Sequence, residues 1–201
     1  LNKYYIAIFF FFFAHGLVYH DLIKLLKIPT IVITDLDIKR TDDEKINFTP
    51  INSLDARTTT NATIQKYKGS DDISNITDHY EDENLYITYQ SEAVEEYYAT
   101  SLEEAFILQN HDNNILNNAI KEVKPKIYEE IVGNPETRKN LVDNSYKLQN
   151  KLSKSKSDFA NWLLYYRSIE DDKEKHPKLP NYINSALDWL KTKLALANDG
   201  Q

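Results

Sequence analysis

The chain has 201 residues, a formal net charge of -7 and no cysteine. The length suits one domain, or one domain with a helical appendage, and the lack of cysteine excludes disulfides, thiolate catalysis and cysteine-based zinc sites. The negative charge argues against a broad nucleic-acid-binding surface. It does not exclude a nuclease site, because bound divalent cations reverse the local field. The four glycines are scattered, so the sequence holds no Walker A loop or dinucleotide fingerprint.

The first part of the chain predicts strand, helix, strand. Residues 4–14 (YYIAIFFFFFA) form an apolar stretch too short for a membrane span of about 20 residues. We interpret it as a buried strand, with the core of a signal peptide as the alternative. Apolar residues at helical spacing follow over 17–26, and residues 30–34 form the next strand. This order predicts a right-handed parallel crossover.

The rest of the chain predicts fewer strands and more helix. Residues 38–57 are expected to form an irregular loop, 58–68 a short helix, 69–83 a weakly structured acidic segment, and 85–89 a third strand. From residue 101 onward we expect helices, with breaks at Pro125, at 133–135 and at 170–180. Residues 182–196 predict a final amphipathic helix. The fold class is therefore α/β, followed by a mostly helical half.

Two carboxylates directly follow the second predicted strand. In an extended chain Asp35 and Asp37 leave the same face, and Leu36 points into the core. Ligands gather at the carboxyl ends of parallel strands, and oxygen ligands of this kind suit Mg²⁺, Mn²⁺ or Ca²⁺. The alternative is structural, with Asp37 capping the next segment and Asp35 paired with Lys39 or Arg40. The strand context favours the metal site.

A second group of polar residues opens the helix SLEEAFIL. Ser101 and Glu104 match a capping box, in which the two side chains satisfy backbone N–H groups of the first turn. Glu103 is not needed for that cap. Its carboxylate suits the positive end of the helix dipole and equally suits a metal ion, so the sequence leaves both roles open.

Lys156 stands at an unusual position for a cation. Ser155 and Asp158 match a helix cap, which places Lys156 in the first helical turn. A cation there opposes the helix dipole by about 0.3–1 kcal/mol, and such local conflicts are typical of functional residues. Lys151 and Lys154 add positive charge nearby, which we interpret as a solvated face.

Five blocks of the sequence occur in an order typical of one nuclease family. They read IPTIVITDLD, TTTNATI, SLEEAFI, KSKSDFANWLLYY and LPNYINSALDWL. The series, from about residue 22 to residue 190, resembles the C-terminal TOPRIM nuclease region of the overcoming-lysogenization-defect (OLD) family of ATP-dependent endonucleases, which includes the nuclease subunits of Gabija-type anti-phage systems. The resemblance implies a TOPRIM-like parallel sheet with flanking helices over residues 1–110, incomplete at its N-terminus. A helical extension over 111–201 would pack on this core.

The resemblance also implies roles for individual residues in metal-dependent hydrolysis of DNA phosphodiester bonds. Asp35 and Asp37 match the family's D-x-D metal ligands. Ser101 and Glu103 fall on its S-x-E element, whose glutamate serves the metal site. Lys156 matches a lysine that stabilises charge in the transition state. The implied cofactor is Mg²⁺ or Mn²⁺.

The resemblance further implies partners, and at some positions this sequence departs from the family pattern. OLD-type proteins carry an N-terminal ATPase domain, the only part that would use ATP, so we expect that domain, a homo-oligomer, DNA as substrate, and a helicase-like partner in the cytoplasm, without a membrane. Thr60 and Asn61 match a T-x-N-like block to which we assign no role. The glutamate of an E-G motif is absent before the first predicted strand, and a phenylalanine run at 9–13 stands where the family has acidic residues and glycine. Part of the metal shell is therefore expected outside these residues or lost.

Two other functions fit parts of the sequence. A hydrophobic strand ending in D-x-D is also typical of haloacid-dehalogenase-type phosphatases, with Asp35 as nucleophile and Asp37 as general acid. Against that reading, Lys39 stands where that family has Thr or Val, and the Asp71-Asp72 pair precedes any suitable Ser and Lys. The other alternative is a catalytically incomplete TOPRIM module with a role in assembly.

Overall fold

The computed structural model describes residues 10–11, 20–132 and 140–199. The chain divides into two compact units, each built from segments far apart in sequence. Unit 1 comprises Leu1–Lys39, Leu54–Glu92 and Pro180–Gln201, and unit 2 comprises Arg40–Ser53 and Ala93–Leu179. This division differs from the predicted boundary at residue 110. Helix α10 (Asn181–Asp199) packs on the sheet, whereas α4 (Leu102–Gln109) packs on later helices. A TOPRIM-like domain over residues 1–110 stays a prediction.

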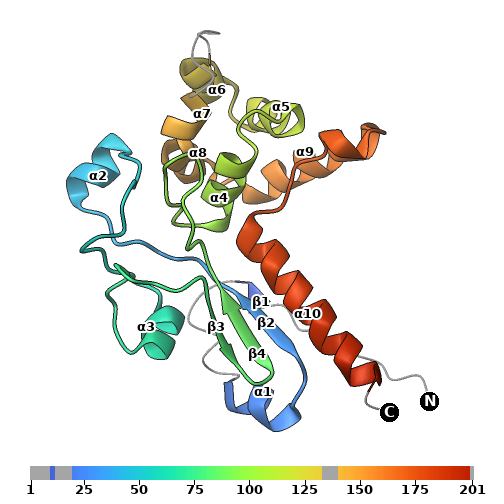
Figure 1. Ribbon diagram of the computed structural model, residues 1–201. Helices are drawn as coiled ribbons and strands as arrows, with labels where there is room; N and C mark the ends of the chain where they lie inside the picture. Colours follow the sequence, from blue (N-terminus) through green and yellow to red (C-terminus); the bar gives the residue numbers. More distant parts are fainter. Residues whose placement is uncertain (1–9, 12–19, 133–139, 200–201) are drawn as a thin grey trace. The chain divides into compact units, whose positions relative to one another are not determined.

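Unit 1 contains a four-stranded sheet in the order β1-β2-β4-β3 (Figure 1). Strands β1 (Phe10–Phe11), β2 (Thr30–Ile33) and β4 (Leu85–Thr88) run parallel, and β3 (His79–Asp82) pairs with β4 antiparallel. The strands predicted at 30–34 and 85–89 are confirmed, while most of the strand predicted over 4–14 lies outside the described residues. Helix α1 (His20–Leu26) lies between β1 and β2 in the chain.

The predictions of a parallel sheet and of a weakly structured segment over 69–83 were wrong at β3. His79 and Asp82 of this strand pair with Thr88 and Leu85 of β4. The polar sequence HYED lies at the edge of the sheet, where no residue of the strand is fully buried. An edge strand needs less apolar surface than a central one, so its sequence lacks the signal that identified β2 and β4. The sheet is mixed.

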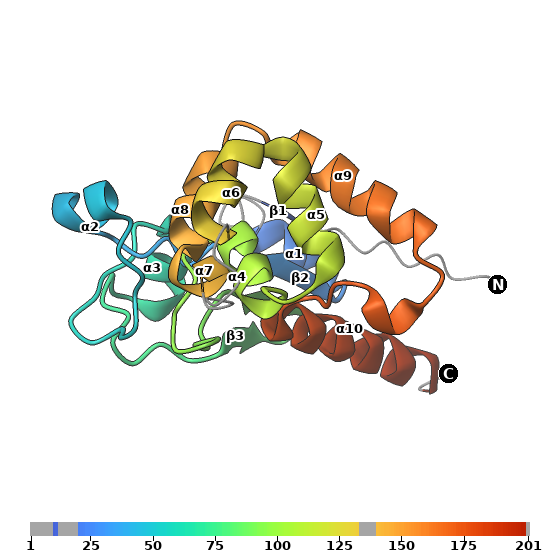
Figure 2. The same cartoon turned by 90° about the horizontal axis from the view of Figure 1, so that it is seen from above.

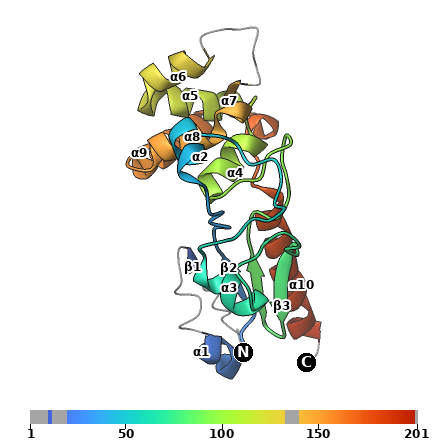
Figure 3. The same ribbon diagram turned by 90° about the vertical axis from the view of Figure 1, so that its left-hand side faces the viewer.

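Helices cover both faces of this sheet, which explains why every residue of β2 and β4 is buried. Helix α10 (Asn181–Asp199) lies on one face and α3 (Ala62–Lys68) on the other (Figure 3). On the α10 face, the Tyr86 ring packs against Trp189 with centroids 5.2 Å apart. On the α3 face, Tyr80 packs against Tyr67 at 4.7 Å. The alternation of Tyr86 and Ile87 along β4 therefore serves two separate helix contacts.

Unit 2 is helical, and α5 (Asn114–Val123) lies beside α9 (Lys156–Ile169) within it (Figure 2). One apolar cluster, which includes the fully buried Leu116, Ile120, Leu148 and Leu152, forms its core. The predicted break at Pro125 is confirmed, because one helix ends at Val123 and the next begins at Pro125, which is well tolerated in a first turn. The helices of this unit are α2 (Asp42–Asn47), α4 (Leu102–Gln109), α5 (Asn114–Val123), α6 (Pro125–Val132), α7 (Asn140–Asp143), α8 (Ser145–Leu152), α9 (Lys156–Ile169) and the 3-10 turn η2 (Lys173–Lys175).

Helix α2 lies in the stretch 38–57 that the sequence predicted to be irregular. Thr41 accepts a hydrogen bond from the Glu44 N–H, and the Glu44 carboxylate accepts from the Thr41 N–H, which completes a capping box. The helix buries no residue, so it has no apolar periodicity to reveal it. Within the described part of the chain, no helix is long and apolar enough to span a membrane.

Candidate functional site

The segment Asp35-Leu36-Asp37 follows β2 in unit 1. Leu36 is 0% exposed, which confirms that it points into the core, and both aspartates are half-buried. Asp37 has a φ of 48°, a left-handed conformation that Asp tolerates better than most residues. The extended geometry predicted through Asp37 is therefore wrong, because the chain turns at this residue. The cap of α2 is Thr41, so Asp37 does not cap the next helix.

Asn61 joins this turn to the start of α3. It is the N-cap residue of α3, and its Oδ1 accepts hydrogen bonds from the backbone N–H groups of the second and third helical residues, at 2.9 and 3.2 Å. Its Nδ2 lies 2.8 Å from the Thr34 hydroxyl, 2.7 Å from the Asp35 carbonyl oxygen and 3.2 Å from Oδ2 of Asp37. One buried amide thus links the helix cap to the D-L-D turn.

Gln90, which follows β4, contacts the same turn from the neighbouring strand. Its Oε1 accepts from the Leu36 N–H at 2.7 Å, and its Nε2 donates to Oδ1 of Asp35 at 3.3 Å and to the Tyr182 hydroxyl at 2.9 Å. Gln90 is 2% exposed. Each aspartate of the D-L-D turn therefore accepts a hydrogen bond from a buried, neutral amide.

The chemistry of this donor set fits a hard divalent cation. Burial raises the pKa of Asp37, and the hydrogen bond from Asn61 lowers it in part. Mg²⁺ is commonly held by one or two carboxylates together with water and substrate phosphates. Among the described residues, no group of three or more His, Cys, Asp or Glu side chains that could hold a metal ion occurs, so this turn offers two carboxylates and no third ligand of these types.

In unit 2, Ser101 caps helix α4 as the sequence predicted. Its hydroxyl accepts from the Glu104 N–H at 3.3 Å. The carboxylate of Glu104, however, accepts from the Thr100 N–H at 2.7 Å, and it lies 3.6 Å from the Arg40 guanidinium. Glu104 is 0% exposed, and burial raises its pKa to about 7. The predicted reciprocal bond, from the Ser101 N–H to the Glu104 carboxylate, is thus replaced by the bond from the Thr100 N–H.

Glu103 and Lys156 are brought together within unit 2. The Lys156 ammonium lies 2.7 Å from Oε1 of Glu103, whose other oxygen is buried without a hydrogen-bond partner in the part of the chain that the structure describes. Lys156 is the first residue of α9, as predicted. The predicted cap bond of Ser155 is not formed, because its hydroxyl accepts from the Lys124 ammonium at 2.9 Å.

The sequence identified Asp35 and Asp37 in unit 1 and Glu103 and Lys156 in unit 2. It singled out Asn61 without a role and did not identify Gln90. Asn61 carries a recognisable signal, since an Asn directly before the helical stretch ATIQKYK is a typical N-cap. That signal predicts the cap alone and not the contacts of Nδ2. Gln90 carries no local signal, because its partners lie 54 and more residues away in the sequence.

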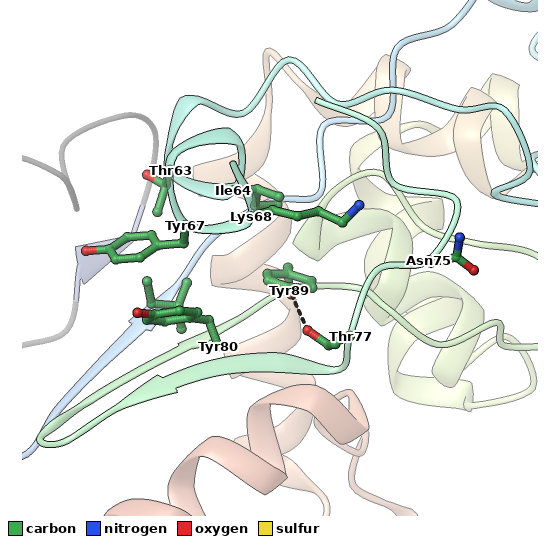
Figure 4. A pocket seen from close by; sticks show the side chains of 9 residues that line it. Thr63, Ile64, Tyr67, Lys68, Asn75, Thr77, Tyr80 and Tyr89 are labelled. Carbon is green, nitrogen blue, oxygen red and sulfur yellow. Dashed lines mark hydrogen bonds between the residues drawn. The ribbon is translucent and has the colours of Figure 1, made fainter. Parts of the chain in front are cut away.

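A separate cavity of about 250 Å³ lies between α3 and the sheet of unit 1 (Figure 4). Tyr67 from α3, Tyr80 from β3 and Tyr89 line it, and the Tyr89 hydroxyl lies 3.4 Å from that of Thr77. Burial raises the pKa of Tyr67 to about 12. The cavity is mainly apolar and holds no carboxylate, so it is distinct in chemistry from the D-L-D turn.

Comparison with known proteins gives one clear relationship. The chain is 52% identical over 198 residues to the endonuclease GajA of Bacillus cereus (strain HuB5-5), a Gabija nuclease of the OLD family. The chain is therefore similar to one region of an OLD-family nuclease. The match covers 96% of this chain and 28% of GajA, in the C-terminal region of that protein. No family model and no solved structure matches the chain.

Proposed function

We propose that this chain forms the nuclease part of an OLD-family protein that hydrolyses DNA phosphodiester bonds in phage defence. The relationship to GajA supports the nuclease role. The observation that carries the metal-dependent mechanism is the D-L-D turn, in which neutral amides hold two half-buried carboxylates. We assign this turn to a TOPRIM-type metal site.

Asp35 and Asp37 would hold Mg²⁺ or Mn²⁺ through their carboxylate oxygens. When bound, such a cation supplies Lewis-acid stabilisation of the phosphate and lowers the pKa of a water molecule. The protein's own contribution is to orient both carboxylates through the hydrogen bonds from Asn61 and Gln90. Leu36 lies between the two aspartates in the sequence, and its buried side chain anchors the turn in the core.

We assign the further roles from the family pattern. Glu103, with Ser101 at the start of the same helix, would serve the metal site, and Lys156 would stabilise negative charge on the phosphate in the transition state. In the structure Lys156 is held by Glu103 at 2.7 Å. Because that contact fixes the ammonium at the first residue of α9, the lysine is positioned by its own unit before substrate binds.

The partners of the whole protein are part of the same proposal. We infer that DNA is the substrate, and that a preceding ATPase domain, the only user of ATP, belongs to the same protein. We also infer that the protein is a homo-oligomer working in the cytoplasm with a helicase-like partner. The net charge of -7 requires that DNA binding depend on the bound cations or on another part of the protein.

Nicking of supercoiled plasmid DNA in the presence of Mn²⁺ tests the proposed function. Asp35→Asn and Asp37→Asn keep the shape of each side chain and remove the charge, so each is expected to reduce the nicking rate at least 100-fold. Asp71→Asn changes an exposed carboxylate of the same unit and should leave the rate unchanged. Full activity of both site variants would refute the metal-dependent mechanism, and phosphate trapped covalently on Asp35 would favour the phosphatase alternative.

A further inference from the structure

We propose that Asn61 and Gln90 are positioning residues, a pair of neutral amides that orient the carboxylates of Asp37 and Asp35 for a divalent cation. This inference rests on the proposed function, because it names residues that act through the proposed metal ligands. Asn61 donates to Oδ2 of Asp37 at 3.2 Å, and Gln90 donates to Oδ1 of Asp35 at 3.3 Å. The two donors flank different elements: Asn61 is the N-cap of α3, and Gln90 lies two residues after the end of β4.

The contacts of Asn61 exceed what its helix cap requires. Asn113 caps α5 in unit 2 with the same bonds, in which Oδ1 accepts from two backbone N–H groups at 2.9 and 3.2 Å. The Nδ2 of Asn113 donates to a backbone carbonyl at a site that is exposed. The Nδ2 of Asn61 points instead to three oxygens around the D-L-D turn, and the residue is 3% exposed. The helix cap accounts for the contacts of Asn61 Oδ1, and the D-L-D turn accounts for the contacts of its Nδ2.

Gln90 has a comparable double use. Its Oε1 accepts from the Leu36 N–H, which fixes the backbone between the two aspartates, while its Nε2 reaches the Asp35 carboxylate and the Tyr182 hydroxyl. Both atoms of the amide are thus used at one turn. If Gln90 only filled space beside Leu36, an apolar side chain would serve as well, and neither Oε1 nor Nε2 would be needed.

Neutral donors are suited to orienting carboxylates that are meant for a metal. A lysine or arginine in the place of these amides would orient a carboxylate and also cancel its charge, which would weaken the attraction for a cation. An amide N–H occupies one of about four lone-pair positions of a carboxylate and leaves its charge in place. Hydrogen bonds of this kind behind a metal ligand are worth about 10- to 100-fold in metal affinity.

The experiment measures Mn²⁺ binding to the full chain by isothermal titration calorimetry, together with the melting temperature. Asn61→Ser keeps a good N-cap acceptor but is too short to donate to Asp37, and Asn113→Ser makes the same change at a cap without aspartate contacts. Asn61→Ser is expected to weaken Mn²⁺ binding about 10-fold in a chain that stays folded. Its melting temperature should fall further than that of Asn113→Ser, because the buried oxygens of Thr34 and Asp35 lose a donor. Gln90→Met, which keeps the length and removes both polar atoms, should also weaken Mn²⁺ binding about 10-fold.

The outcomes separate this inference from the proposed function. If Asp37→Asn removes Mn²⁺ binding while Asn61→Ser and Gln90→Met bind Mn²⁺ as the unchanged chain does, the positioning role is refuted and the metal site stands. If Asp35→Asn and Asp37→Asn leave Mn²⁺ binding unchanged, the proposed metal site itself is refuted. A loss of binding in Asn61→Ser that only follows a loss of folded protein, seen by circular dichroism, would also refute the positioning role.

Discussion

Lys156 at the first residue of α9 and Glu103 in the first turn of α4 form an ion pair, with 2.7 Å between Nζ and Oε1. This contact offsets the unfavourable position of a cation at a helix N-terminus, which the sequence alone presents as a local conflict. The side chain of Glu103 is 13% exposed and that of Lys156 is 40% exposed. The Lys156 side chain is therefore the more accessible partner of the pair, and its ammonium is open to contact with a phosphate.

Lys156→Met is expected to reduce the nicking rate about 100-fold, because the ammonium would no longer stabilise charge on the phosphate. The free energy of unfolding should fall by less than about 1 kcal/mol, since a pair so exposed on one side contributes little to stability. Plasmid nicking and urea unfolding measure the two effects. The large effect on rate and the small effect on stability together identify a functional lysine.

The matched control for this prediction is Lys147→Met. Lys147 forms an ion pair with Glu130 at 2.6 Å within the same unit, and nothing assigns it to the reaction. If the nicking rate falls equally in Lys147→Met and Lys156→Met, both variants act through the fold of unit 2. That result would refute the catalytic role of Lys156.

The buried Glu104 makes stability depend on pH. Burial raises its pKa from 4.5 to about 7 in spite of the Thr100 N–H and Arg40. A carboxyl group with a raised pKa binds more protons in the folded than in the unfolded chain. Its contribution to stability is present at pH below about 4.5 and is lost as the pH rises to about 7. At about 1.4 kcal/mol per pKa unit, the loss amounts to roughly 3 kcal/mol.

Glu104→Gln removes this titration and is expected to flatten the pH dependence by the same amount. The free energy of unfolding in urea, measured at intervals from pH 4.5 to pH 8 for both proteins, checks the prediction. The substitution also changes the contact with Arg40. Because glutamine does not titrate, its own contact with Arg40 contributes the same free energy of unfolding at every pH. Equal slopes in the two proteins would mean that Glu104 keeps its ordinary pKa in the folded chain.

The Tyr67 hydroxyl offers a stabilising substitution. It is buried at the cavity beside α3 and has no hydrogen-bond partner in the described part of the chain. Because an unsatisfied buried polar group is costly, Tyr67→Phe is expected to raise the free energy of unfolding by about 1 kcal/mol. Tyr89→Phe, which removes a hydroxyl that has Thr77 as a partner, should not stabilise the chain. Urea unfolding of both variants measures the change in the free energy of unfolding. A lower value for Tyr67→Phe than for the unchanged chain would contradict the prediction.

The sequence predicted those parts of the fold and the site that depend on local patterns. The β-branched run of β2, the helices from α4 onward and the position of Lys156 at a helix start all follow from periodicity and from helix-start chemistry. The burial of Leu36 follows from alternation along the chain. In each case the determining interactions lie within a few residues.

Features that depend on distant partners could not be predicted. The antiparallel edge strand β3 is stabilised by pairing with β4 and has no apolar pattern of its own. Glu104 serves a buried ion pair with Arg40, 64 positions earlier in the numbering, and the capping-box pattern concealed that role. The contact of Gln90 with Asp35 spans 55 residues. Asp37, in its left-handed conformation, likewise accepts from Asn61, 24 residues away.

The most direct test of the metal site is paramagnetic broadening of backbone amide signals by Mn²⁺ in the ¹⁵N-labelled chain. With Mn²⁺ well below one equivalent, the amide signals of Asp35, Leu36, Asp37 and Asn61 are expected to broaden first, and Asp37→Asn should abolish this selective effect. Broadening confined to the acidic segments at 69–83 or 170–174 would contradict the central claim, because the cation would then bind away from the D-L-D turn.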